Sequence, residues 1–104
     1  GYSTARDLLA FAEAMRRGRL VRPATAERLW SAKPDLGSPD YAFGFGVGRD
    51  ALGRTAGHSG GFSGISSILD IYPDTGWTLV VLSNVDGGMF PVAQKLREVA
   101  GRIR

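Results

Sequence analysis

The sequence predicts an α+β fold, in which an antiparallel β-sheet of about four strands is flanked by N- and C-terminal helices. Two observations carry this prediction. Apolar residues recur at helical spacing near both ends of the chain, whereas residues 41–83 alternate as strands do and are broken by glycine- and proline-rich turns. The length of 104 residues suits one small domain.

The first helix is predicted to begin at Ser3 and Thr4, since Asp7 follows Thr4 at the spacing of a capping box. Gly18 is expected to end it. The apolar positions between them that share one helical face are Leu8, Phe11, Ala12 and Met15.

A short second helix is expected to begin at Pro23, because proline is favoured in a first helical turn. Leu29 and Trp30 would lie on its buried side, and it would end before Lys33-Pro34. Residues 35–40 have the composition of a loop.

Strands are expected next, at residues 41–48, 54–61, 65–72 and 77–83. In the first, bulky side chains alternate with alanine and glycine, and a polar turn at 49–53 follows it. The sequence Pro73-Asp74-Thr75-Gly76 is a strong turn signal, so the last two strands should form an antiparallel hairpin. The closing helix is marked by Phe90, Ala93, Leu96, Val99, Ala100 and Ile103, with Pro91 in its first turn.

Composition excludes several classes of function. The formal net charge is +3, but the basic residues are scattered, and the cluster from Arg16 to Arg22 suits a helix C-terminus better than nucleic acid, so no nucleic acid is expected as a partner. No apolar run approaches the about 20 residues of a membrane span. There is no cysteine, the aspartates lack metal-ligand spacing, and no metal or other cofactor is implied.

The most unusual stretch is residues 57–64, GHSGGFSG, which holds four glycines and the only histidine of the chain. It could be a tight turn without chemistry, because glycine-rich turns are common. Its first five residues also satisfy the G-x-S-x-G pattern of a hydrolase nucleophile elbow, with Ser59 as nucleophile. That interpretation fails on context, since β-branched strand follows in place of a helix and no second histidine could serve as base.

A third interpretation rests on a family resemblance. Residues 57–67, GHSGGFSGISS, resemble the third active-site motif of the serine β-lactamase-like hydrolases, a superfamily of class C β-lactamases, penicillin-binding D-alanyl-D-alanine peptidases and esterases. Residues 3–8, STARDL, resemble that family's S-T-A-x-D-L helix start, and DIYPDTG at 70–76 with LVVLSN at 79–84 resembles its closing hairpin. The similarity runs in order along nearly the whole chain, and it implies part of a β-lactamase/transpeptidase-like fold.

The resemblance also implies roles for four residues in acyl transfer through a serine ester. His58 stands where the family has Lys or His, a group that orients the catalytic hydroxyls or the substrate. The alternative is a histidine whose hydrogen bonds are made within a turn and which has no role in catalysis. Ser59 matches the hydroxyl that contacts substrate, and Gly60 keeps the strand bare so that substrate can lie along its edge. The backbone N–H of Gly61 matches the second donor of the oxyanion hole. Histidine in place of lysine favours an ester or peptide over a β-lactam as substrate.

Two motifs of that family are missing from the sequence. S-x-x-K, which holds the nucleophile, is not completed by Lys33 or Lys95, and Y-x-N is absent as well. The chain also begins without methionine. We therefore expect residues 1–104 to be the C-terminal portion of a catalytic domain, inactive alone and partnered by an N-terminal half.

A non-catalytic binding or interaction module built on the same sheet is the competing hypothesis. In either case a sheet edge should be left unpaired, and exposed edges favour self-association.

Overall fold

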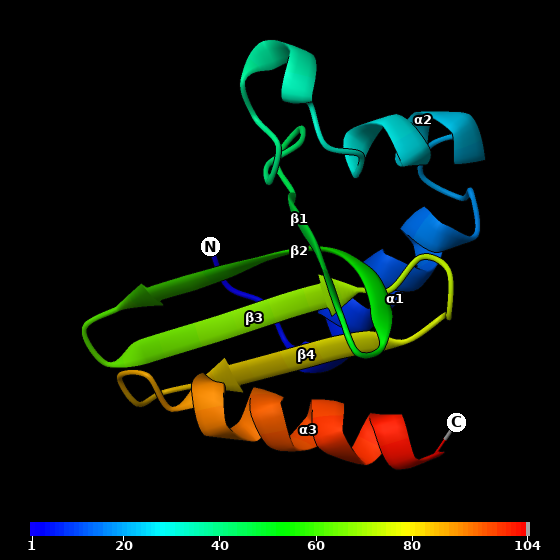
Figure 1. Ribbon diagram of the computed structural model, residues 1–104. Coiled ribbons are helices and arrows are strands. Elements are labelled where there is room, and N and C mark those ends of the chain that lie inside the picture. The colour runs from blue at the N-terminus through cyan, green and yellow to red at the C-terminus, as the bar shows by residue number, and fades with distance from the viewer. Residues whose placement is uncertain (104) are drawn as a thin grey trace.

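The computed structural model describes residues 1–103 and confirms the predicted α+β fold (Figure 1). Four strands form one antiparallel sheet in the order β1-β2-β3-β4. The elements, in chain order, are α1 (Ala5–Arg16), α2 (Pro23–Leu29), a 3-10 turn (Pro34–Leu36), β1 (Gly46–Asp50), β2 (Gly53–Phe62), β3 (Ile65–Ile71), β4 (Thr78–Ser83) and α3 (Met89–Ile103).

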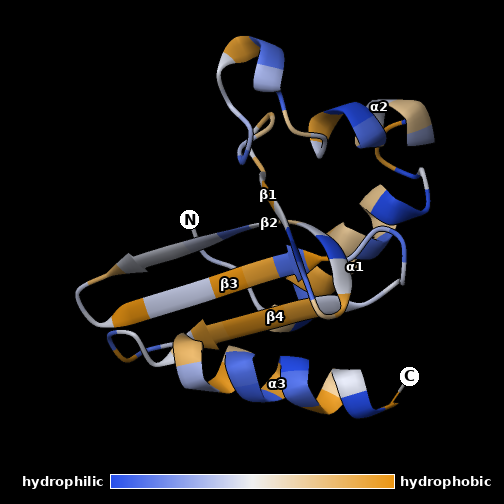
Figure 2. Ribbon diagram, viewed as in Figure 1, coloured by the Kyte–Doolittle hydropathy of each residue, from blue (hydrophilic) through white to orange (hydrophobic). Residues whose placement is uncertain are grey.

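The helices cover opposite faces of the sheet, with α1 behind it and α3 in front in the view of Figure 1. One buried cluster joins the sheet to α3 and centres on Tyr72, which is fully buried, and Met89. The other joins it to α1 and α2, and includes Ala56, Ile71 and Trp30. Side chains alternate along each strand, so β3 contributes Ile71 to one cluster while Tyr72, just beyond its end, contributes to the other. Strands β3 and β4 therefore lie between two helical layers; β4 is mostly hydrophobic, whereas β3 mixes hydrophobic and polar residues (Figure 2).

Local signals define the ends of the elements as expected. The Thr4 hydroxyl accepts a hydrogen bond from the Asp7 N–H at 3.1 Å, which caps α1. Gly18 follows the end of α1 with φ of 72°, a left-handed conformation that glycine adopts without steric cost. Trp30 is buried directly after α2, as predicted.

The first predicted strand is wrong over residues 41–45. Strand β1 begins only at Gly46, because the chain folds into a tight loop in which the Ala42 N–H donates to the Phe45 carbonyl at 2.7 Å. Gly44 supports this loop with φ of 80°. The aromatic residues there alternate in sequence but contact different partners: Phe45 packs on Trp30, whereas Tyr41 reaches across to His58.

Two smaller expectations also change. The turn predicted over 49–53 shrinks to Ala51 and Leu52, since the Asp50 carboxylate accepts a hydrogen bond from the Leu52 N–H at 2.8 Å and closes the β1–β2 turn. The loop predicted at 35–40 begins with the Pro34–Leu36 turn.

None of the helices within residues 1–103 has the length and apolar character needed to cross a membrane. The predicted domain ends at Arg104, which lies outside the described residues. That the domain is incomplete without an N-terminal half remains a prediction.

Candidate active site

The glycine-rich stretch forms the second half of β2, and this half of the strand is exposed. Strand β1 pairs only with Gly53–Gly57, whereas β3 pairs with β2 from Ala56 to Phe62. Residues 58–62 are therefore bonded to a neighbour on one side only, and all five are exposed. The structure places His58, Ser59, Gly60 and Gly61 together on this free edge.

The glycines of the stretch differ in what surrounds them. A methyl group on Gly57 would lie 2.0 Å from the Leu69 carbonyl oxygen, which no side chain can tolerate. On Gly60 the nearest atom would be the Ser67 hydroxyl at 3.7 Å, and on Gly61 a carbonyl oxygen at 3.8 Å, both ordinary contacts. Packing therefore requires glycine at 57 only, and the bare backbone at 60 and 61 leaves room for a molecule outside the sheet.

Neighbouring side chains of β2 lie on opposite faces of the sheet. His58 is opposite Leu69, which packs with the α1 and α2 cluster, and Ser59 is opposite Ile68, which packs with the α3 cluster. An open hollow of about 220 Å³ is lined by Ser59–Phe62 on one side and, on the other, by Asp86 of the loop before α3 and Phe90 of its first turn. A second hollow, of about 350 Å³, lies beside His58.

The walls of the smaller hollow are held by hydrogen bonds. The buried Ser66 hydroxyl accepts from the Met89 N–H at 3.0 Å and donates to the Val85 carbonyl at 2.9 Å. The Asp86 carboxylate accepts from the Gly64 N–H of the β2–β3 hairpin. These contacts fix the hairpin relative to the start of α3, so the strand edge is presented on a rigid support.

His58 has a partner at each ring nitrogen. Its Nδ1 lies 2.6 Å from the Ser59 carbonyl oxygen, and its Nε2 lies 2.9 Å from the Tyr41 hydroxyl. The rings of Tyr41 and His58 meet edge to face, with centroids 5.7 Å apart and an interplanar angle of 88°. The imidazole is thus exposed but oriented.

Sequence reasoning missed Tyr41 as a site residue. It lies in the loop that replaces the predicted strand, where Ser38 donates a hydrogen bond from its hydroxyl to the Tyr41 carbonyl at 2.7 Å. An isolated bridge to Gly46 holds the other end of the loop. No local pattern marks Tyr41, because its contact with His58 spans 17 residues and depends on how the loop folds back.

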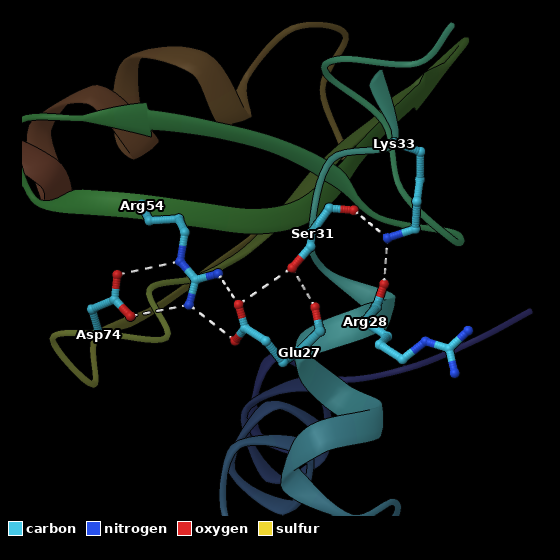
Figure 3. A network of polar contacts seen from close by, with 6 residues as sticks. All are labelled: Glu27, Arg28, Ser31, Lys33, Arg54 and Asp74. Carbon is cyan, nitrogen blue, oxygen red and sulfur yellow. Dashed lines mark hydrogen bonds and ion pairs between the residues drawn. The ribbon is translucent and has the colours of Figure 1, made fainter. Parts of the chain in front are cut away.

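A polar network anchors α2, the helix that leads into this loop, to the sheet (Figure 3). The Arg54 guanidinium of β2 binds the Glu27 carboxylate of α2 at 2.5 Å and the Asp74 carboxylate of the β3–β4 turn at 3.0 Å. The hydrogen bond from Arg54 lowers the pKa of Glu27, and the two carboxylates raise the pKa of Arg54.

Lys33 lies at the end of the same network and is not free for catalysis. Its ammonium donates to the Arg28 carbonyl at 2.7 Å and the Ser31 carbonyl at 2.6 Å (Figure 3). The same ammonium lies 4.8 Å from the centroid of the Phe43 ring. The lysine thus stabilises the loop that carries Tyr41.

A second network lies at the far end of the strands. Tyr72 donates its hydroxyl proton to the Asp50 carboxylate at 2.8 Å, and Arg97 of α3 binds Asp70 at 2.5 Å and the Tyr72 oxygen at 3.3 Å. Burial, and then the bond to Asp50, raise the pKa of Tyr72 to about 12. Within residues 1–103 no group of three or more His, Asp or Glu side chains could hold a metal ion.

Comparison with known proteins agrees with this architecture. The family model described as Beta-lactamase matches residues 1–102, which is nearly the whole chain. No curated protein and no solved structure matches the chain.

Proposed function

The chain belongs to the Beta-lactamase family, and from that premise we propose that it forms one wall of a serine acyl-hydrolase active site whose nucleophile comes from a segment outside residues 1–104. The observation that carries the proposal is the free edge of β2 over residues 58–62, with bare backbone where packing does not require it. An extended acyl substrate can add to such an edge by main-chain hydrogen bonds.

Each residue of the edge has a role in this site. The N–H of Gly61 is one donor of the oxyanion hole, and a donor of this kind contributes about 3 kcal/mol to transition-state stabilisation. The Ser59 hydroxyl contacts a carbonyl or carboxylate of the substrate, and Gly60 keeps the surface bare for it. His58 orients the polar groups of the reaction, and its lack of a permanent charge favours esters and peptides over β-lactams.

Apolar side chains support the proposal of a partner segment. On the face of the sheet near α1, the side chains of Phe62, Ile65 and Leu82 are 79%, 55% and 43% exposed, and the ring of Tyr2 is fully exposed. A hollow of about 550 Å³ lies among Tyr2, Leu8, Ile65 and Leu82. We assign this surface to the segment that supplies S-x-x-K, because it lies next to the free edge where that serine is needed.

The test uses the complete product of the gene that encodes this chain, treated with a fluorescent penicillin and with a p-nitrophenyl ester. We expect covalent labelling of one serine or turnover of the ester. If no serine is labelled and the ester is not turned over, the proposal is overturned and a non-catalytic binding module is favoured.

Two variants decide the role of Ser59. Ser59→Ala should slow acylation but leave its final stoichiometry unchanged, because Ser59 contacts substrate and is not the nucleophile. Ser63→Ala, in the adjacent hairpin turn, is the matched control and should leave the rate unchanged. Loss of all acylation in Ser59→Ala would contradict the assignment and identify Ser59 as the nucleophile.

A further inference from the structure

The hydrogen-bond partners of His58 determine where its proton lies. The Ser59 carbonyl oxygen, 2.6 Å from Nδ1, has no proton to give, so Nδ1 must carry the hydrogen and donate it. In a neutral imidazole the other nitrogen is then an acceptor. The Tyr41 hydroxyl, 2.9 Å from Nε2, therefore donates to it.

We propose that Tyr41 is a positioning residue for His58: together with the Ser59 carbonyl, its hydroxyl favours the Nδ1–H tautomer and orients the imidazole at the free edge of β2. This inference deepens the proposed function and rests on it for its consequence in catalysis. The contact itself stands on the geometry of the two side chains, 2.9 Å between Tyr41 Oη and His58 Nε2 with the rings edge to face.

The surroundings of Tyr41 suit this role. Its main chain is held by the Ser38 hydroxyl and by the bridge to Gly46, so the hydroxyl is delivered to a defined place. The side chain is 41% exposed, so the hydroxyl makes no large contribution to the core. Lys33 and the Glu27–Arg54 contacts fix the preceding segment.

The pairing changes what His58 offers to a substrate. While the imidazole is neutral, both ring nitrogens are engaged, and the atom free to interact outward is the Tyr41 oxygen, which accepts hydrogen bonds. When Nε2 takes a proton, Nε2–H donates to the Tyr41 oxygen, and the Tyr41 O–H becomes free to donate outward. The two residues thus act as one unit that is an acceptor in one protonation state and a donor in the other.

The test is a nitrogen NMR spectrum of the chain labelled with ¹⁵N-histidine, in which His58 is the only imidazole. At alkaline pH, where histidine is neutral, we expect a protonated, pyrrole-type Nδ1 and an unprotonated, pyridine-type Nε2. Tyr41→Phe removes only the hydroxyl, and should increase the population of the Nε2–H tautomer of His58. The Nδ1 and Nε2 resonances should then move in opposite directions. Tyr2→Phe, at a fully exposed ring, is the control and should leave both resonances unchanged.

A wild-type spectrum with the proton on Nε2, or a Tyr41→Phe spectrum equal to that of the wild type, would overturn the inference. Ser38→Ala provides a second variant that leaves the Tyr41 side chain intact, and it should produce a smaller shift in the same direction. The spectrum needs neither nucleophile nor substrate. Failure of acylation would therefore contradict the proposed function, whereas a wrong tautomer would contradict this inference alone.

Discussion

The two halves of strand β2 are continuous in the chain but differ in their pairing with β1 and in their exposure. Residues 53–57 pair with β1, and Ala56 and Gly57 among them are buried between two strands. Residues 58–62 pair only with β3 and are exposed. The first half holds the sheet together, while the second presents backbone and polar side chains at an open edge. The difference shows that one strand can be packed along one segment and open along the next, with the boundary where its pairing to β1 ends.

The largest effect is expected from Gly57→Ala, which tests the packed half. Its methyl group would collide with the Leu69 carbonyl 2.0 Å away, and relieving such a clash should cost about 3 kcal/mol of the free energy of unfolding. Gly61→Ala is the matched control in the open half. It should change that free energy by less than about 0.5 kcal/mol, measured by urea denaturation. Equal losses in the two variants would contradict the division of β2.

A smaller effect is expected from Tyr72→Phe, which removes the hydroxyl that ties the β1–β2 turn to α3 through Asp50 and Arg97. The free energy of unfolding should fall by about 1.5 kcal/mol at neutral pH, because a partly buried hydrogen bond to a charged group is broken.

The same tyrosine should shape stability at high pH. Its pKa is raised from 10.0 to about 12 in the folded chain, so its contribution is complete below pH 10 and lost as the pH rises to about 12. Denaturation curves of wild type and Tyr72→Phe should therefore converge over that interval. A constant difference between them would show that Tyr72 does not titrate as its surroundings require.

Arg54→Met tests the network that connects the packed half to α2. Both carboxylate partners are more than half exposed, so the loss should be at most about 1 kcal/mol at neutral pH. Because Arg54 lowers the pKa of Glu27 below its ordinary 4.5, this contribution is present above that pH and lost as the pH falls through the folded-state value. Thermal denaturation of the wild type and of Arg54→Met at neutral and at acid pH checks both statements. A stability difference between the two proteins that grows on acidification would contradict them.

Phe62→Lys in the open half is expected to have the smallest effect on stability. It should, however, measurably change the self-association of the chain. The unpaired edge and the exposed Phe62 should make the chain self-associate at high concentration, and a lysine on the edge should weaken this. Sedimentation velocity over a range of concentrations measures the effect. A sharply monomeric wild type would contradict the prediction.

Local chemistry explains how much of the fold was predictable. Helix α1 begins where Thr4 caps it, and the turn after β3 follows Pro73 to Gly76, because each signal acts within a few residues. The strand predicted at 41–45 failed for the opposite reason. Its alternation of aromatic residues and glycine suits a strand equally well, but the positive φ of Gly44 and the packing of Phe45 on Trp30 favour a loop.

The sequence by itself determined the order of helices and strands, the family, and the motif whose residues 58–61 line one edge of the sheet. Only the tertiary structure decided which part of that strand is open, which glycine is needed for packing, and which side chain meets His58. Capping and turn preferences act between neighbours in the chain. The end of β1 beside Gly57 and the contact of Tyr41 with His58 depend instead on segments that meet after folding.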